Sequence, residues 1–364
     1  MEPSPAKPLT PRENRESPSR SSTDELRAWL AATGHPVAAL TPLDGDVSPR
    51  RYSRLTLAVG TTAILATYPE EVGATCPRFL ATTALLEGAG VRVPRVLAAD
   101  CDKGAMLLED LGPRTLADWA LATRPPWSEL TPYFADALAQ ARQIAALPPE
   151  RVAELSPPLG RELLEKELRQ TWDFFLVPRG LTGGDGGDAG DAGSPEAAAL
   201  ESLLAELCAR LAADPAVPCH RDFMARNLMP LPDFSEPGGP GGRPRVGVLD
   251  HQDLRLGPPA YDLASLLNDT LFPTPEVEAA FLAELAPSPE ARLRYHRAAA
   301  QRTLKAVGTY AAFARRGATR HLPLIPPTLG RCLGHLERLP EAAALVHRLA
   351  RLWRDTIAGT APAP

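Results

Sequence analysis

Lysine is scarce in this chain of 364 residues, and one long stretch of the sequence lacks it altogether. Only four of the 39 Lys and Arg residues are lysines: Lys7, Lys103, Lys166 and Lys305. Residues 8–102 therefore contain no lysine, so an anion bound there cannot be held by one. The long cationic side chain that remains is that of arginine, whose guanidinium can donate hydrogen bonds to two phosphate oxygens at once.

Other shortages exclude whole classes of protein. The chain has a net charge of −5 and no basic block, so we expect no nucleic acid as a partner. No apolar run approaches the roughly 18 residues of a membrane span, and the N-terminus lacks the apolar core of a signal peptide. Five cysteines, an odd number without C-x-x-C spacing, predict reduced and mostly buried thiols in a cytoplasmic protein. With 44% apolar residues, the chain can still build a sizeable core.

The first third of the chain predicts a short tail followed by a small lobe. Residues 1–21 are rich in Pro, Ser and charge, so we expect disorder there. A capping box from Ser22 to Glu25 opens an amphipathic helix that stops at Gly34. We assign residues 22–112 to the small lobe. Its further expected elements are strands at 39–43, 51–59, 62–68, 93–99 and 105–108, with a helix at 76–87.

The rest of the chain, residues 113–364, predicts a larger and mainly helical lobe, because helical periodicity covers most of it. Two Gly-rich stretches, residues 180–195 and 233–245, predict flexible inserts. The second insert lies between two short strands, where the tip of a hairpin can lengthen at little cost. An antiparallel sheet followed by a helical lobe predicts an α+β fold of the bilobal, protein-kinase-like kind.

The most informative motif runs from His220 to Asn227 (HRDFMARN) and is followed by a strand that ends in Asp250. The pattern H-R-D-x-x-x-x-N, with an Asp after the next strand, is the layout that a kinase uses around a transferring phosphoryl group. We predict that Asp222 is the catalytic carboxylate, which positions an acceptor hydroxyl and accepts its proton. Asn227 and Asp250 offer the oxygen ligands that Mg²⁺ prefers. ATP and Mg²⁺ are the expected cofactors.

We expect four further residues to support this loop or to contact the substrate: His220, Arg221, Asp253 and Asp262. We expect His220 to brace the loop through hydrogen bonds. Arg221 either pairs with an acid or a phosphate, or has a surface or loop-bracing role. Asp253 either contacts the substrate or the metal, or caps the following turn. Asp262 begins a helix, where a carboxylate accepts backbone N–H groups and can buttress the catalytic loop.

The spacing between Asp250 and Asp262 separates two kinds of kinase. A protein kinase needs an activation segment between its metal-binding Asp and the next helix of the lobe. Here the next helix is expected within about a dozen residues of Asp250, which leaves no room for the docking platform of a protein substrate. The sequence therefore predicts a small-molecule acceptor.

The small lobe lacks the lysine that kinases place on the nucleotide phosphates, and the paired helix Glu is absent as well. The third strand has no lysine, and the helix at 76–87 has no acid before Glu87, at its end. One interpretation is a pseudokinase, which binds a nucleotide or a partner without turnover. The other is that an arginine takes over. Strand alternation places Arg51 and Arg50 on opposite faces, and we favour Arg51 over Arg50.

Several segments together resemble one known superfamily over residues 35–355. They are Gly45 to Tyr52 (GDVSPRRY), Leu107 to Gly112 (LLEDLG), His220 to Met229, Asp250 to Asp253 (DHQD), Gly257-Pro258 and Tyr261 to Leu263 (YDL). They resemble the aminoglycoside phosphotransferase/choline kinase-like superfamily and, within it, the bacterial anomeric sugar kinases for N-acetylmuramate and N-acetylglucosamine. The resemblance implies that Ser48, Glu109 and Leu111 contact the nucleotide.

This resemblance also implies an ATP-dependent kinase whose product, a sugar 1-phosphate, feeds the salvage of cell-wall precursors. Another acceptor, such as an aminoglycoside, choline, homoserine or a different sugar, stays open, as does a nucleotide-binding scaffold without turnover. The apolar run from Phe223 to Ala225 departs from the polar residues expected near a sugar, and His251 stands where the related enzymes more often carry Phe. We expect a monomer.

Overall fold

The computed structural model describes residues 21–43, 49–179, 195–231 and 244–358. These divide into a small unit, formed by the described residues up to Leu80 and by residues 95–110, and a large unit, formed by residues 81–94 and by those from Leu111 onward. The predicted tail and both predicted inserts fall almost wholly outside the described residues. Within the described part, no helix is long and apolar enough to cross a membrane.

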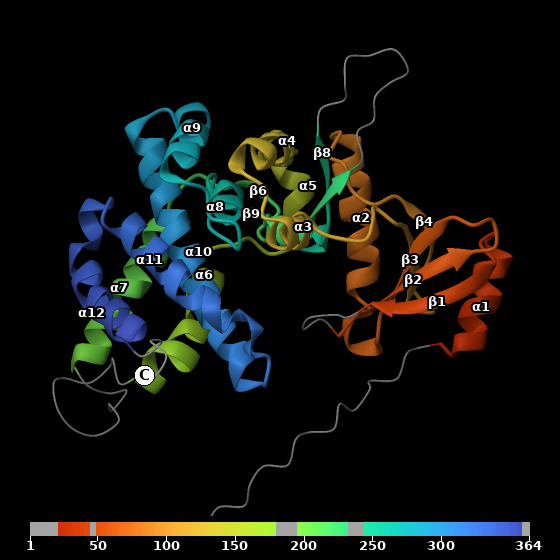
Figure 1. Cartoon of the computed structure of the whole chain (residues 1–364), viewed down its shortest axis with the longest axis horizontal. Coiled ribbons are helices and arrows are strands. Elements are labelled where there is room, and N and C mark those ends of the chain that lie inside the picture. The colour runs from red at the N-terminus through yellow and green to blue at the C-terminus, as the bar shows by residue number, and fades with distance from the viewer. Residues whose placement is uncertain (1–20, 44–48, 180–194, 232–243, 359–364) are drawn as a thin grey trace, which may run out of the picture. The chain divides into compact units, whose positions relative to one another are not determined.

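The small unit is an antiparallel sheet with helices, as predicted. Its strands follow the order β1-β2-β3-β5-β4 (Figure 1), and the division between the two units falls within the residues of the helix α2. The elements are α1 (Thr23–Ala32), β1 (Val37–Leu43), β2 (Arg51–Leu57), β3 (Thr62–Thr67), a 3-10 turn (Glu70–Val72), α2 (Thr75–Gly88), β4 (Val96–Asp100) and β5 (Ala105–Glu109).

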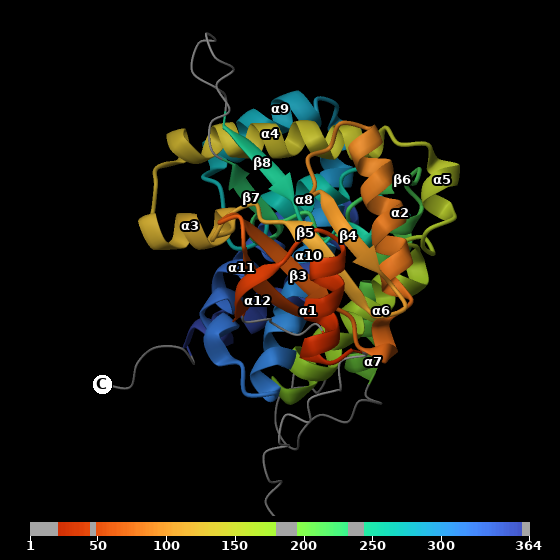
Figure 2. The same cartoon turned by 90° about the vertical axis from the view of Figure 1, so that its right-hand side faces the viewer.

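Alternation along the strands gives this sheet two apolar faces. The predicted capping box is present, because the Ser22 side chain accepts from Glu25 N–H and the Glu25 carboxylate accepts from Ser22 N–H. It fixes the start of α1, which lies along one face of the sheet (Figures 1 and 2) and buries Leu26 and Leu30 against β2 residues such as Leu55. The opposite face packs against the first turns of α2.

One expectation about the cysteines is wrong. Cys76, in the first turn of α2, forms a disulfide with Cys101, which follows β4. The other three cysteines, Cys208, Cys219 and Cys332, are free and buried as predicted. Sequence spacing could not reveal the pair, because 25 residues separate its members and only the folded sheet brings α2 beside the end of β4.

The large unit is mainly helical, with two short strand pairs. Its helices are α3 (Leu116–Thr123), α4 (Trp127–Ala145), α5 (Pro149–Ala153), α6 (Arg161–Thr171), α7 (Pro195–Ala212), α8 (Tyr261–Leu267), α9 (Pro275–Leu285), α10 (Pro289–Arg315), α11 (Ile325–Leu336) and α12 (Ala343–Ala358). A π-helical turn (Trp172–Leu176) and a 3-10 turn (Val177–Arg179) follow α6, and the strands are β6 (Val217–Cys219), β7 (Leu228–Leu231), β8 (Arg245–Val248) and β9 (Arg255–Gly257). Other 3-10 turns cover Ala225–Asn227, His251–Asp253, Thr319–Leu324 and Pro340–Ala342.

The long helix α10 packs against α6, α8 and α11. It crosses α6 closely at Gly308, because a Cβ placed there would lie 2.4 Å from the Thr171 backbone nitrogen. Thr171 Oγ1 donates to the carbonyl oxygen of Leu304 at 2.7 Å across the same crossing. Glycine is therefore the residue that lets these two helix backbones approach.

Two antiparallel strand pairs frame the segment that contains the H-R-D motif. β6 pairs with β9, and β7 forms the predicted hairpin with β8, with Leu228 opposite Val248. The edge of the hairpin is tied to the chain at Arg92, whose carbonyl accepts from Val248 N–H at 2.7 Å. The H-R-D motif therefore lies between two paired strands, β6 and β7. Asp250 follows a third paired strand, β8.

Candidate active site

Asp262, in the first turn of α8, fixes the backbone of the H-R-D loop. Its two carboxylate oxygens accept from the N–H groups of His220, at 2.7 Å, and Arg221, at 2.9 Å. Arg221 has a left-handed φ of 77°, which costs free energy for a residue with a side chain. The paired hydrogen bonds hold the loop in this conformation, which is the buttressing arrangement expected of Asp262.

His220 is buried, and its ring joins the loop to the end of β8. The Nε2–H group donates to the carbonyl oxygen of Leu249 at 2.8 Å, since a carbonyl can only accept. The imidazole also meets the ring of Phe223 edge-on, with the ring centroids 5.6 Å apart. These contacts are the kind that a bracing role requires.

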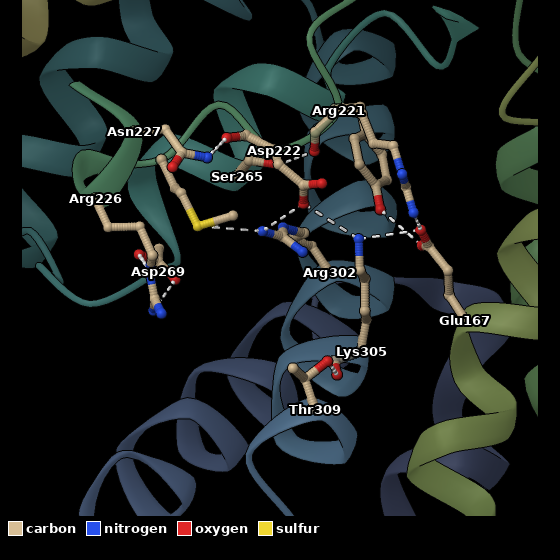
Figure 3. Close-up of polar contacts among 12 residues, drawn as sticks. Glu167, Arg221, Asp222, Arg226, Asn227, Ser265, Asp269, Arg302, Lys305 and Thr309 are labelled. Carbon is tan, nitrogen blue, oxygen red and sulfur yellow. Dashed lines mark hydrogen bonds and ion pairs between the residues drawn. The ribbon is translucent and has the colours of Figure 1, made fainter. Parts of the chain in front are cut away.

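Asp222 lies among positive charges contributed by α10 (Figure 3). Its Oδ1 is 3.2 Å from Arg302 Nη2 and 3.3 Å from Lys305 Nζ. Burial by itself would raise the pKa of the Asp222 carboxyl, but the cations of Lys305, Arg302 and Arg221 outweigh it and hold this pKa well below its usual range. The carboxylate is therefore ionised across the neutral and mildly acidic range.

Arg221 and Asp253 belong to a second set of ion pairs beside Asp222. Arg221 Nη2 is 2.7 Å from Glu167 Oε1, and Arg221 Nη1 pairs with Asp253 Oδ2. The other Asp253 oxygen accepts from Arg255 Nη2 at 2.6 Å. Of the alternatives that the sequence left open, the structure places Arg221 against two acids and places Asp253 against two guanidinium groups.

Asn227 and Asp250 are brought together through the hairpin. Asn227 Nδ2 donates to the carbonyl oxygen of Asp222 at 2.8 Å, which identifies the side-chain oxygen as the atom available to a cation. Leu249 N–H donates to the backbone oxygen of Asn227 at 2.8 Å, so the residue before Asp250 is bonded to the end of the loop. Asp250 has a left-handed φ of 58°, and its Oδ1 accepts from Gln252 Nε2 at 2.8 Å.

This pair of oxygen donors fits Mg²⁺. The ion keeps several waters and substrate oxygens, so one or two protein carboxylate or amide ligands suffice. Among the described residues, no group of three or more His, Cys, Asp and Glu side chains forms a metal cage. Two protein donors leave the remaining positions around a Mg²⁺ ion for phosphate oxygens and water.

Sequence reasoning missed three residues of this site: Glu167 on α6, and Arg302 and Lys305 on α10. Lys305 Nζ is 3.0 Å from Glu167 Oε1 and thus joins α6 to Asp222. One signal was available. Arg302 and Lys305 are charged residues three apart in a stretch of α10 that is otherwise uncharged, and such residues share one helix face. Glu167 offered no comparable signal among the many charges of α6.

Of the residues predicted to bind the nucleotide, Ser48 lies outside the described residues. The Arg50 guanidinium lies over the ring of Tyr52, 5.9 Å from its centroid, on the face of the sheet that packs against α2. Arg51 begins β2, is exposed, and alternates onto the face of Leu55, which α1 covers. Their roles remain predictions.

The connector residues Glu109 and Leu111 are both fixed by local contacts. Glu109 Oε2 accepts from Arg95 N–H at 3.1 Å, at the end of β5. Leu111 is buried against β8, because a Cβ on Gly247 would lie 2.4 Å from Leu111 Cδ1. No lysine occurs on β3 and no acid occurs on α2 before Glu87, so the usual lysine–glutamate pair is absent from these two elements.

Proteins of known structure share this fold. A choline/ethanolamine kinase family protein from Mesorhizobium loti has a TM-score of 0.55 at 19% identity, over 90% of this chain and 99% of that chain. The ADP-bound aminoglycoside phosphotransferase APH(2'')-Ib also has a TM-score of 0.55, at 12% identity, over 88% of this chain and 99% of that chain. These likenesses confirm the predicted α+β, protein-kinase-like fold.

Sequence comparison gives a more specific result. A relative from Pseudomonas aeruginosa named N-acetylmuramate/N-acetylglucosamine kinase is 32% identical over 87% of this chain and 89% of its own length. A protein of the same name from Pseudomonas putida is 30% identical over the same shares of both chains. The model of the phosphotransferase enzyme family matches residues 39–296. This chain therefore belongs to the phosphotransferase enzyme family.

Proposed function

We propose that this protein is an ATP-dependent amino-sugar kinase that phosphorylates the anomeric hydroxyl of N-acetylmuramate or N-acetylglucosamine. The names of the relatives that match most of the chain support this acceptor class. The observation that carries the proposal is the H-R-D loop itself. It places the ionised Asp222 five residues before Asn227, and Asn227 is hydrogen-bonded to the strand end that leads into Asp250.

In the proposed reaction, Asp222 orients the sugar hydroxyl and accepts its proton. The sugar oxygen forms a bond to the γ-phosphorus while the bond from that phosphorus to the bridging oxygen of ADP breaks. Because phosphoryl transfer has a loose transition state, orientation of the hydroxyl matters more than the strength of the base. The lowered pKa of Asp222 is compatible with such an orienting role.

Asn227 and Asp250 are the proposed ligands of Mg²⁺, through the Asn227 side-chain oxygen and the Asp250 carboxylate. When bound, the ion neutralises the charge that builds up on the phosphate oxygens. The contact from Gln252 to Asp250 Oδ1 holds the carboxylate in place.

Arginine is the proposed replacement for the missing lysine, with Ser48, Glu109 and Leu111 also contacting the nucleotide. Two observations support Arg50 over Arg51, which reverses the preference drawn from the sequence. Arg50 lies over Tyr52 on the face of the sheet that packs against α2, whereas Arg51 belongs to the face that α1 covers. A guanidinium can hold two phosphate oxygens at once.

We also propose that the protein acts in the cytoplasm as a monomer, because ATP is its substrate and each unit has a core of its own. A reducing cytoplasm normally keeps thiols unpaired, so the Cys76–Cys101 disulfide is unusual for that compartment. Fractionation of the source cells, followed by light scattering on the purified protein, tests both statements. Recovery from an extracellular fraction, or as a stable dimer, would refute them.

The acceptor is tested by ATP consumption with purified protein and a panel of amino sugars, aminoglycosides, choline and homoserine. We expect rapid consumption with N-acetylmuramate or N-acetylglucosamine only. Consumption with another acceptor alone would assign the protein to that acceptor. Measurable binding of Mg·ATP without consumption by any acceptor would favour the nucleotide-binding scaffold.

A further inference from the structure

Two cations on α10 reach the same oxygen of Asp222. Arg302 Nη2 and Lys305 Nζ lie 3.2 and 3.3 Å from Oδ1 (Figure 3), and the described residues form no hydrogen bond to Oδ2. The two cationic side chains are only 6% and 13% exposed, whereas Asp222 is 26% exposed. The carboxylate is thus held through Oδ1 by two cations that are less exposed than the carboxylate itself.

Lys305 also forms an ion pair with an acid of another helix. Glu167 of α6, which is 6% exposed, pairs with Lys305 at 3.0 Å. Glu167 also accepts from Arg221 through Oε1 and from Tyr261 through Oε2, at 3.3 Å. Burying an ammonium group costs free energy that two carboxylates must offset. Lys305 therefore has a defined position between a fixed acid and the acid predicted to be catalytic.

We propose that Lys305, together with Arg302, is a positioning residue that binds Oδ1 of Asp222 and so directs Oδ2 toward the acceptor hydroxyl. This inference rests on the proposed role of Asp222 in phosphoryl transfer. β3 carries no lysine, whereas α10 supplies one beside the proposed catalytic carboxylate. Lys305 acts through Asp222 and does not itself contact the nucleotide.

The proposed role of Lys305 can be tested through the pKa of the Asp222 carboxyl, because the charges around this carboxyl determine that pKa. Burial raises the pKa of Asp222, and the surrounding cations lower it by a larger amount. The titratable and charged groups that act on it are Arg221 and His220 of the loop, Arg302 and Lys305 of α10, and Tyr261 and Asp262 of α8. Two further acids face these groups: Glu167 of α6 pairs with Lys305 and Arg221, and Asp253 of the His251–Asp253 turn pairs with Arg221. Removal of one cation must raise the pKa of Asp222.

The test compares Lys305→Met with Lys305→Arg, which keeps the charge. Arg297→Met is a matched control on the same helix, because Arg297 is 14% exposed and ion-paired to Glu341 but does not contact Asp222. We expect Lys305→Met to lower kcat for the amino sugar about 100-fold, as for a misplaced catalytic group, with little change in KM for ATP. Lys305→Arg should recover most of the loss, and Arg297→Met should behave like the native protein.

A second readout needs no acceptor. In protein labelled with ¹³C at the Asp carboxyls, Asp222 is assigned by comparison with Asp222→Asn and titrated by NMR. We expect the Asp222 carboxyl to stay ionised through the acidic range in the native protein, because the surrounding cations hold its pKa well below the usual range, and to titrate at a higher pH in Lys305→Met. If Lys305→Met does not fold, Lys305→Gln, which keeps a hydrogen-bonding group without the charge, takes its place.

The two readouts separate this inference from the acceptor assignment. If no amino sugar is phosphorylated but the Asp222 titration shifts, the acceptor is wrong and the coupling of Lys305 to Asp222 stands. If Lys305→Met, or Lys305→Gln in its place, leaves both kcat and the titration of Asp222 as in Arg297→Met, Lys305 is not a positioning residue.

Discussion

At the residue scale, side chains from elements far apart in the sequence set the ion pairs and the position of Asp222. Lys305, which is 83 residues from Asp222, pairs with it and also with Glu167. Asp262 fixes the backbone just before Asp222 by accepting from His220 N–H. Glu167 and Asp262 are buried, Lys305 is only 13% exposed, and all three are paired, so the loss of one partner leaves another charge without compensation. The site is for this reason sensitive to substitutions that keep size and change charge only.

The first prediction concerns the two acids of the site. Asp222→Asn should lower kcat by about 10²–10⁴-fold and leave the Kd for Mg·ATP nearly unchanged, because Asp222 acts on the acceptor. Asp250→Asn should weaken Mg·ATP binding and abolish turnover, because Asp250 binds the metal. Steady-state kinetics and calorimetry measure both effects, with surface Asp173→Asn as the control. Near-native turnover in either site variant would disprove the assignment.

A second residue-scale prediction concerns a pair of histidines, the buried His335 and the half-buried His296. His335 Nε2–H donates to Asn268 Oδ1 at 2.7 Å, which leaves its Nδ1 as the acceptor for His296 Nδ1–H at 3.0 Å. The arrangement requires a neutral His335 ring, because its Nδ1 must keep a lone pair to accept from His296. Burial, with help from Arg338, lowers the pKa of His296 to about 4.

Because this folded-state pKa lies below the unfolded value, the stabilisation is complete above the unfolded pKa and is lost as the pH falls toward 4. Between neutral pH and about pH 5, His296 should account for a loss of about 1–2 kcal/mol in the free energy of unfolding. Urea denaturation of the native protein and of His296→Gln at several pH values measures this loss. The variant should show a shallower pH dependence, and His347→Gln, on the exposed side of α12, should not. Equal slopes in all three proteins would contradict the prediction.

At the scale of elements, the crossing of α6 and α10 sets the spacing of the charged residues. Gly308 and Thr171 lie about one helical turn beyond Lys305 and Glu167 on their helices. A side chain at Gly308 would push against the α6 backbone, which cannot move aside as the end of a flexible side chain could. The Lys305–Glu167 contact would then lengthen.

The third prediction follows from this crossing. Gly308→Ala should lower the free energy of unfolding by about 1–3 kcal/mol or more through overpacking, and should also lower kcat. Gly334→Ala on α11 is the matched control, because the nearest atom to its added Cβ is the end of the Arg338 side chain at 3.6 Å. That control should be neutral or slightly stabilising. Equal behaviour of the two variants in urea denaturation would contradict the close approach.

Local elements were predictable from the sequence because their signals are local. The Ser22 capping box, the strands of the small unit and the hairpin of β7 and β8 all depend on neighbouring residues. The loop motif likewise identified Asp222, Asn227 and Asp250 as candidates. In contrast, the disulfide of Cys76 and the contact of Lys305 with Asp222 arise only when distant elements pack together. Their spacing along the chain carries no sign of either.

At the scale of the whole molecule, family membership is established, and the acceptor remains a proposal. The relatives named for N-acetylmuramate and N-acetylglucosamine match from the small unit to the helices of the large unit, over 87% of the chain. Structures with the same fold belong to choline and aminoglycoside kinases, so the fold by itself does not select the acceptor. Selection must come from side chains near Asp222.

The most direct measurement is ³¹P NMR of a reaction that contains the purified protein, Mg·ATP and either amino sugar. We predict the formation of ADP together with a phosphomonoester signal coupled to the anomeric proton, and the loss of both in Asp222→Asn. Absence of this signal with both sugars, while the protein binds Mg·ATP, would contradict the account.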